Sequence, residues 1–108
     1  MKTAVVGSTG ITVPDLENYL PPQTTEIISD GVNGVCISAK KYAMKHGIKY
    51  AEFPPEYEIS SHSAALKRNT AIIEYADIVL VFWDGKNQCT KSLIDKCNEM
   101  GVPIRVFV

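Results

Sequence analysis

The sequence predicts a three-layer α/β sandwich, with a five-stranded parallel sheet of order 3-2-1-4-5 and helices on both faces. Residues 78–83 form an unbroken apolar run, which is typical of a strand buried on both sides. Asp84-Gly85 ends the run with turn chemistry, and apolar residues at helical spacing follow it. Short apolar runs alternate with helical patterns along the rest of the chain, as in sheets built from right-handed crossovers.

The chain begins with a strand expected over residues 3–6 and a glycine loop over residues 7–10. A helix is expected next, over residues 12–20. Thr12 and Asp15 resemble a capping box at its start, and a pair of prolines stops it.

A second strand, loop and helix follow in the same way. Residues 26–28 form the strand, residues 29–34 a second glycine loop, and the helix after it stops at Gly47. Residues 48–53 read as the third strand. An irregular segment over residues 54–61 is of the kind that covers a site or lies in an interface.

The second half repeats the alternation. A helix is expected over residues 62–75, and the apolar run follows it as the fourth strand. Thr90 offers a side-chain oxygen to open the next helix. Gly101 and Pro103 mark its end before a last strand over residues 104–108.

Composition limits the classes of function. The 108 residues are 45% apolar and 21% charged, which fits one compact domain spanning residues 1–108. A net charge of -1 gives no electrostatic case for nucleic acid or an anionic membrane as partner. No apolar segment is long enough to span a bilayer, and the first residues lead into a strand instead of a signal peptide, so we expect a cytoplasmic protein. Three cysteines without C-x-x-C spacing predict reduced thiols and no zinc site.

The expected strand order brings three loops to one edge of the sheet. These loops begin at Gly7, Ser29 and Asp84, each directly after a strand. Ligands of open α/β sheets bind at this edge, and the N–H groups at helix starts favour an anion. The first loop lacks both the full G-x-G-x-x-G and the P-loop pattern, so no nicotinamide cofactor, and no cofactor of another kind, is predicted.

Six short motifs occur in order along the chain: Val6-Gly7-Ser8, Ile28-Ser29-x-Gly31-x-x-Gly34-Val35, Glu52-Phe53-Pro54, Arg68-Asn69, Ala76-Asp77, and Phe82-Trp83-Asp84-Gly85 with Thr90-Lys91. In this order they resemble the YspA-like branch of the SLOG superfamily over essentially the whole chain. The resemblance implies a Rossmann-like fold that binds a nucleotide or nucleotide-derived ligand, often in homodimers or larger homo-oligomers. Some related domains sense nucleotide signals, and others cleave an N-glycosidic bond.

The loops and the resemblance together assign a ligand pocket, with no catalytic residue and no metal ligand. The pocket residues are Gly7, Ser8, Thr9, Ser29, Gly31, Gly34, Arg68, Asn69, Asp84, Gly85 and Thr90. Arg68 is expected to offer a guanidinium fork to phosphate or ribose; the alternative is an exposed residue paired with Glu74 or Asp77. Asp84 either accepts bonds from sugar hydroxyls or only turns the chain.

Departures from the family pattern keep two other functions open. Asp30 and Cys36 replace family residues in the second loop, and Cys89 replaces a glycine before Thr90. The glutamate that follows this threonine closely in the phosphoribohydrolases has no counterpart, so glycosidic cleavage would fall to Asp84 or Asp30. The altered loops also fit a degenerate protein-interaction module.

The cysteines have a chemical and a structural reading. Cys89 and Cys36 lie near helix starts, a setting that lowers the pKa of a thiol. A nucleophile needs a base, and the predicted elements do not bring either histidine next to these thiols; His46 is at a helix end, and only His62 is in a segment able to reach over the crevice. Small buried apolar residues are the expected role of both cysteines.

Overall fold

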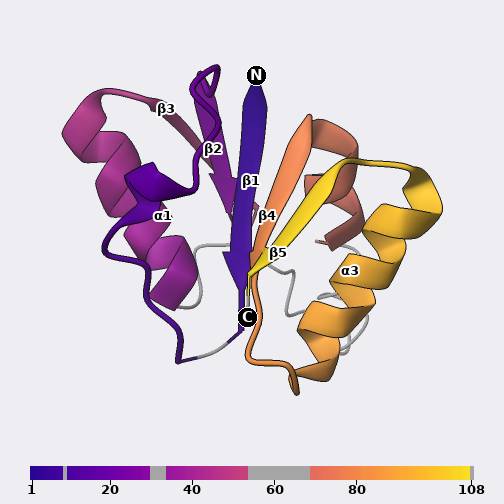
Figure 1. Cartoon of the computed structure of the whole chain (residues 1–108). Helices are drawn as coiled ribbons and strands as arrows, with labels where there is room; N and C mark the ends of the chain where they lie inside the picture. Colours follow the sequence, from indigo (N-terminus) through magenta and orange to yellow (C-terminus); the bar gives the residue numbers. More distant parts are fainter. Residues whose placement is uncertain (9, 30–33, 54–68, 108) are drawn as a thin grey trace.

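The computed structural model describes residues 1–8, 10–29, 34–53 and 69–107. Its five strands form one parallel sheet in the order β3-β2-β1-β4-β5. The strands are β1 (Lys2–Gly7), β2 (Glu26–Ser29), β3 (Lys49–Glu52), β4 (Ile78–Phe82) and β5 (Ile104–Phe107) (Figure 1). The predicted Rossmann-like α/β class and strand order are therefore confirmed.

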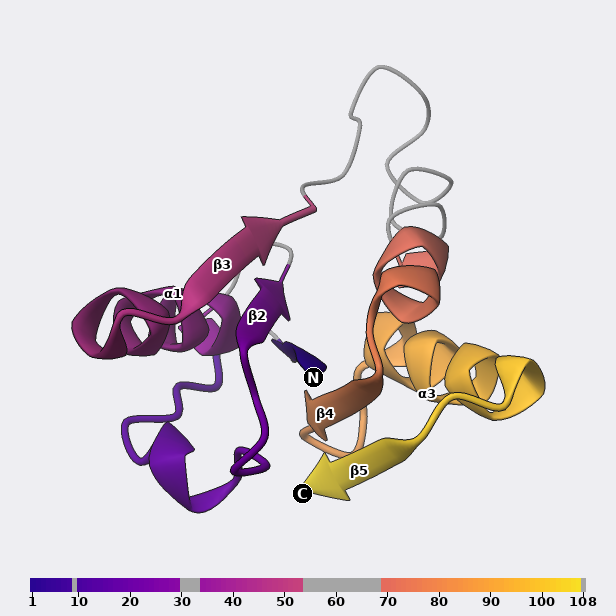
Figure 2. The same cartoon turned by 90° about the horizontal axis from the view of Figure 1, so that it is seen from above.

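Helices lie on both faces of the sheet, as predicted. One face carries the 3-10 helix η1 (Leu16–Asn18) and α1 (Gly34–His46). The other carries α3 (Gln88–Met100) and the helical residues 69–75. Figure 2 shows the sheet running between these two layers.

Alternating side chains of the central strands build two separate cores. Val79 and Val81 of β4 pack on the face covered by α3, and Leu80 and Phe82 pack on the face covered by α1. All residues of β4 are buried. This explains why the strand reads as an unbroken apolar run instead of an alternating one.

The helix predicted over residues 12–20 is wrong: the structure has only the three-residue η1 there. Asp15 is its N-cap but makes no side-chain capping bond, so the expected capping box does not form. The Val13 N–H instead donates to Ser38 Oγ of α1 at 3.1 Å, which ties this residue to another element and not to a helix of its own. Leu16 still reaches the core, so the apolar pattern identified the buried side but not the local conformation.

The start of α3 also differs from the prediction. Asn87, not Thr90, is the N-cap, and its Oδ1 accepts from the Thr90 N–H at 3.0 Å. Thr90 is the third residue of the helix. The predicted stops are confirmed, since Gly47 and Gly101 follow α1 and α3 with φ of 66° and 71°.

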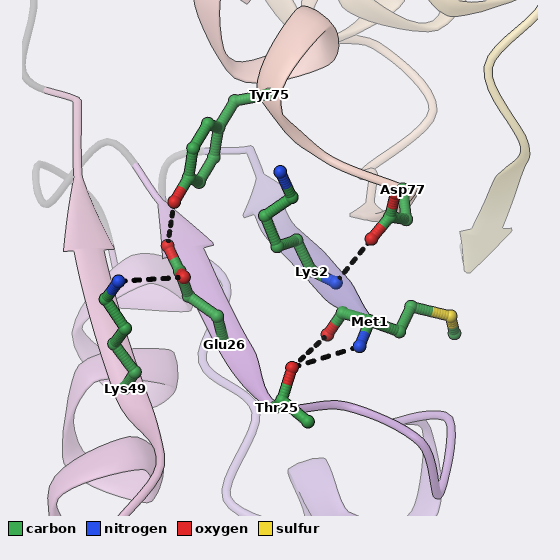
Figure 3. A network of polar contacts seen from close by, with 7 residues as sticks. All are labelled: Met1, Lys2, Thr25, Glu26, Lys49, Tyr75 and Asp77. Carbon is green, nitrogen blue, oxygen red and sulfur yellow. Dashed lines mark hydrogen bonds and ion pairs between the residues drawn. The ribbon is translucent and has the colours of Figure 1, made fainter.

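A polar network ties the amino ends of the strands together, at the edge opposite the candidate site (Figure 3). Glu26 is 6% exposed and accepts from Tyr75 Oη at 2.6 Å, and Lys49 Nζ lies 3.5 Å from its other oxygen. Asp77 accepts from the Lys2 N–H at 2.7 Å. The network therefore joins β1, β2 and β3 to Tyr75, the last of the helical residues 69–75, and to Asp77 just after them.

Several predicted elements lie partly or wholly outside the described residues. The irregular segment 54–61 lies wholly outside them, and so do residues 62–68 of the helix expected over 62–75; residues 69–75 are helical. Residue 9 of the first glycine loop, residues 30–33 of the second and residue 108 of the last strand are also outside. Among the described helices, none is long and apolar enough to cross a membrane.

Candidate functional site

The candidate site lies at the carboxyl ends of β1 and β4, where the chain leaves these two strands toward opposite faces of the sheet. These strands are neighbours in the sheet, and Gly7 at the end of β1 pairs with Phe82 at the end of β4. The chain after β1 leads to the face with η1, whereas the chain after β4 leads to α3 on the other face. This is the topological switch point of the sheet, the usual location of ligands in open α/β folds.

Two glycines of the predicted pocket are required by protein packing. A Cβ at Gly7 would lie 2.6 Å from Phe82 O and 2.7 Å from a Val35 methyl carbon. A Cβ at Gly34 would lie 2.5 Å from Ile11 O. Both glycines therefore hold the loops close to neighbouring elements, whatever a ligand contributes.

The loop after β1 is joined to α3 by a directed series of hydrogen bonds. The Asp84 N–H donates to Ser8 Oγ at 3.3 Å, and Ser8 Oγ lies 3.1 Å from Thr90 Oγ1. Thr90 Oγ1 donates to Asn87 Oδ1 at 3.2 Å, so the proton between Ser8 and Thr90 comes from Ser8. Both hydroxyl protons are thus used within the protein, and neither side chain donates to a ligand in this arrangement.

Asp84 organises the loop between β4 and α3. Its Oδ1 accepts from the N–H groups of Lys86 and Asn87, both at 2.8 Å. These backbone bonds, the Asn87 one first, lower the pKa of Asp84 below its usual value. The turn uses Oδ1 alone, and Gly85 inside it has a φ of 82° that favours glycine. Asp84 is therefore a charged carboxylate at neutral pH with one oxygen outside the turn.

Ser29 lies at the end of β2 and belongs to a second group of hydrogen-bonded side chains, with Tyr50 and Glu52 of β3. Its Oγ is 2.5 Å from Tyr50 Oη, and Tyr50 Oη donates to Glu52 Oε1 at 3.0 Å. Ser29 must then donate to Tyr50. Burial is the largest cause of the raised pKa of Tyr50, which keeps the phenol protonated. The fully buried Ser29 hydroxyl thus supports the sheet edge, and no hydrogen bond joins it to Ser8.

Of the other residues in the predicted pocket, only Asn69 lies in the described part of the chain. Asn69 is buried at the start of the helical residues 69–75. Thr9, Gly31 and Arg68 lie outside the described residues, as do Asp30 and His62.

The cysteines differ from one another in exposure. Cys36 is buried, and its Sγ lies 3.7 Å from Val5 O, as expected for a small core residue. The same expectation is wrong for Cys89, which is exposed because the second position of α3 faces away from the sheet.

The His46 ring packs against the Tyr42 ring at the end of α1, with 4.2 Å between the ring centroids. In the described part of the chain, no cluster of three His, Cys, Asp or Glu side chains could hold a metal ion.

Sequence reasoning missed two partners of the predicted pocket residues, Asn87 for Thr90 and Tyr50 for Ser29. Asn87 caps α3 through its side chain, and its carbonyl accepts from Trp83 Nε1 at 3.1 Å. The spacing of Asn87 and Thr90 is that of an N-cap and its third helical residue, so this signal was present in the sequence. Tyr50 had no such signal, because its partner Ser29 lies on a neighbouring strand.

Comparison of the chain with models of known protein families, with curated proteins and with solved structures finds no match.

Proposed function

We propose that the protein binds a nucleotide or nucleotide-derived ligand at the carboxyl edge of its sheet. The observation that carries the proposal is the preorganised switch point between β1 and β4. There, Ser8 and Thr90 fix the first turn of α3 against the loop after β1. Open α/β sheets bind nucleotides at such points, and the resemblance to the YspA-like SLOG branch favours the same ligand class.

Backbone groups and one carboxylate would make the contacts. The Thr90 N–H is taken by Asn87, and the first intrahelical bond is that from Lys91 N to Asn87 O. The N–H groups of Gln88 and Cys89 precede it, and they would face a phosphate or another anion at the helix start. Asp84 Oδ2 would accept from a ribose hydroxyl, since the negative charge of Asp84 disfavours phosphate beside it.

Arg68 would add positive charge to that of Lys86, whose ammonium group already acts on Asp84. It is the residue that the resemblance assigns to phosphate or ribose, and a guanidinium would offset the repulsion between Asp84 and a phosphate. The proposed division is therefore Arg68 and the start of α3 for the anion, and Asp84 for the sugar.

A thermal-shift screen tests the proposal. Purified protein is melted with adenosine and guanosine phosphates, ADP-ribose, NAD and cyclic nucleotides. A ligand at about 100 times its dissociation constant adds about 2.7 kcal/mol, which raises the midpoint by roughly 10 °C in a domain of this size. Arg68→Ala should remove the rise. Arg105→Ala is the matched control, because Arg105 is an exposed residue of the edge strand β5.

The same samples separate binding from turnover. Chromatography of a bound nucleoside monophosphate should return it intact. Release of free base that is lost in Asp84→Ala would instead establish the phosphoribohydrolase alternative. A flat response over the whole panel would contradict nucleotide binding and direct the search to protein partners.

A further inference from the structure

A groove lies between α1 and the part of the β1–β2 connection around η1. Its volume is about 580 Å³, within the range of small-molecule sites. One wall is formed by residues 12–14, 16 and 17, and the other by α1 residues between Gly34 and His46. On this face the β1–β2 connection contains only the three-residue η1. Figure 2 shows η1 and α1 on the same side of the sheet.

The walls of this α1 groove are held in place by the protein itself. The Val13 N–H donates to Ser38 Oγ, which in turn donates to Gly34 O at 2.9 Å. Leu16 anchors the first wall in the core, with 1% of its surface exposed. Ile11 and Gly34 are in close contact at the end of the groove near the start of α1. A ligand would therefore meet a preformed groove and would not have to order it.

The lining combines apolar residues with two lysines. Val13 and Leu16 are apolar lining residues of the first wall, and Ile37 of α1 is a large apolar lining residue that is 48% exposed. Lys41 and Lys45, one helical turn apart on α1, also line the groove. Among the described residues, neither lysine lies within ion-pair distance of an acidic group.

From this lining we infer that the α1 groove binds a small organic monoanion, a carboxylate or sulfonate that carries an apolar body. The anion would lie between Lys41 and Lys45, and the apolar part would cover Val13 and Ile37. Glu17 and His46 line the same groove, so the formal net charge of its lining, with His counted as neutral, is a single positive one. That charge favours a monoanion over a phosphate dianion. Among the described residues of the predicted nucleotide pocket, only Gly34 also lines this groove; the described residues of the β4–α3 loop do not line it.

Anilinonaphthalene sulfonate is a suitable probe, because it joins one sulfonate to an aromatic body. Its fluorescence should rise on titration into the folded protein. Two-dimensional amide NMR should show shifts at residues 12–17 and 34–46. The neutral phenylnaphthylamine, which has the same rings without the sulfonate, should bind more weakly.

Matched variants on the same helix test the two parts of the lining. Lys41→Gln and Lys45→Gln should each weaken binding on the order of threefold, and about tenfold together. Lys40→Gln is the control, since Lys40 is exposed on α1 outside the groove. Ile37→Asp should weaken binding more than tenfold, because it replaces an apolar contact by a like charge. Met44→Asp, the same change at a residue 72% exposed outside the groove, should leave binding unchanged.

The variants alter exposed positions, and their melting curves should match that of the parent protein. Equal binding of the probe to the parent and to the double lysine variant would overturn the inference. So would amide shifts confined to residues outside 12–17 and 34–46, or equal affinity for the neutral analogue.

Discussion

Ser8 and Thr90 share a buried hydrogen bond of 3.1 Å although 82 positions separate them in the sequence. The bond crosses the switch point and joins the end of β1 to the first turn of α3. Both residues are almost fully buried, at 1% and 7% exposure. Their first role is therefore to fix the helix start relative to the sheet, and any ligand contact at this edge depends on that placement.

Removing the Ser8 hydroxyl should destabilise the fold. Ser8→Ala leaves the Asp84 N–H and Thr90 Oγ1 without their partner, a loss of about 1–3 kcal/mol in the free energy of unfolding. Urea denaturation measures it. Ser92→Ala, at an exposed position of α3, should change stability by less than about 0.5 kcal/mol. Additive effects of Ser8→Ala and Thr90→Val in a double-mutant cycle would contradict the shared bond.

The pKa of Asp84 predicts a loss of stability in acid. The backbone N–H groups of Asn87 and Lys86 favour the charged carboxylate in the folded state, so the pKa is lower when folded than when unfolded. Its stabilising effect is complete above the unfolded pKa and disappears as pH falls through the folded value. Asp84→Asn should therefore flatten the acid side of the stability profile, measured by urea denaturation at several pH values. An unchanged slope, judged against Asp15→Asn in the exposed turn before η1, would contradict this role.

The three cysteines should react at different rates with a thiol reagent at pH 8. Cys89 is exposed and should react first, while Cys36 and Cys97 are buried. Burial also raises the pKa of Cys97 to about 11, so its thiol stays protonated at this pH. Ellman's reagent should titrate one thiol quickly and the other two only after unfolding. Cys89→Ser should remove the fast phase, and a second fast thiol would contradict the described packing.

The sheet could be predicted from sequence because its signals are local. The apolar run of β4 and the glycine stops at Gly47 and Gly101 require no knowledge of distant residues, and the structure confirms them. The helix expected over residues 12–20 failed for the opposite reason. Its conformation depends on a bond from Val13 to Ser38, in a helix that comes later in the chain. Apolar spacing alone could not distinguish η1 from a longer helix.

The candidate site was less predictable than the sheet. Alternation of strands and helices was enough to place Ser8, Asp84 and Thr90 at one edge. It could not show that the hydroxyl protons of Ser8 and Thr90 are used within the protein, because hydrogen-bond direction depends on the side chains opposite. Gly7 illustrates the same limit: its close contact with Phe82 is visible only once β1 and β4 are paired.

Tyr75 should stabilise the amino-terminal edge of the sheet through Glu26. Its hydroxyl donates to Glu26 Oε2 at 2.6 Å, which is the largest cause of the raised pKa of Tyr75 (Figure 3). Tyr75→Phe leaves the buried Glu26 carboxylate with Lys49 as its charged partner, and therefore lowers the free energy of unfolding. Urea denaturation tests this against Tyr19→Phe. The Tyr19 ring packs on Phe82, and its hydroxyl makes no hydrogen bond to the described residues. Equal stability of the two variants would contradict the role of Tyr75.

A double-mutant cycle tests whether Tyr75 and Glu26 act as a pair. Adding Glu26→Gln to Tyr75→Phe should then lower the free energy of unfolding by less than Glu26→Gln does in the parent protein, because the hydrogen bond between the Tyr75 hydroxyl and the Glu26 carboxylate is already absent.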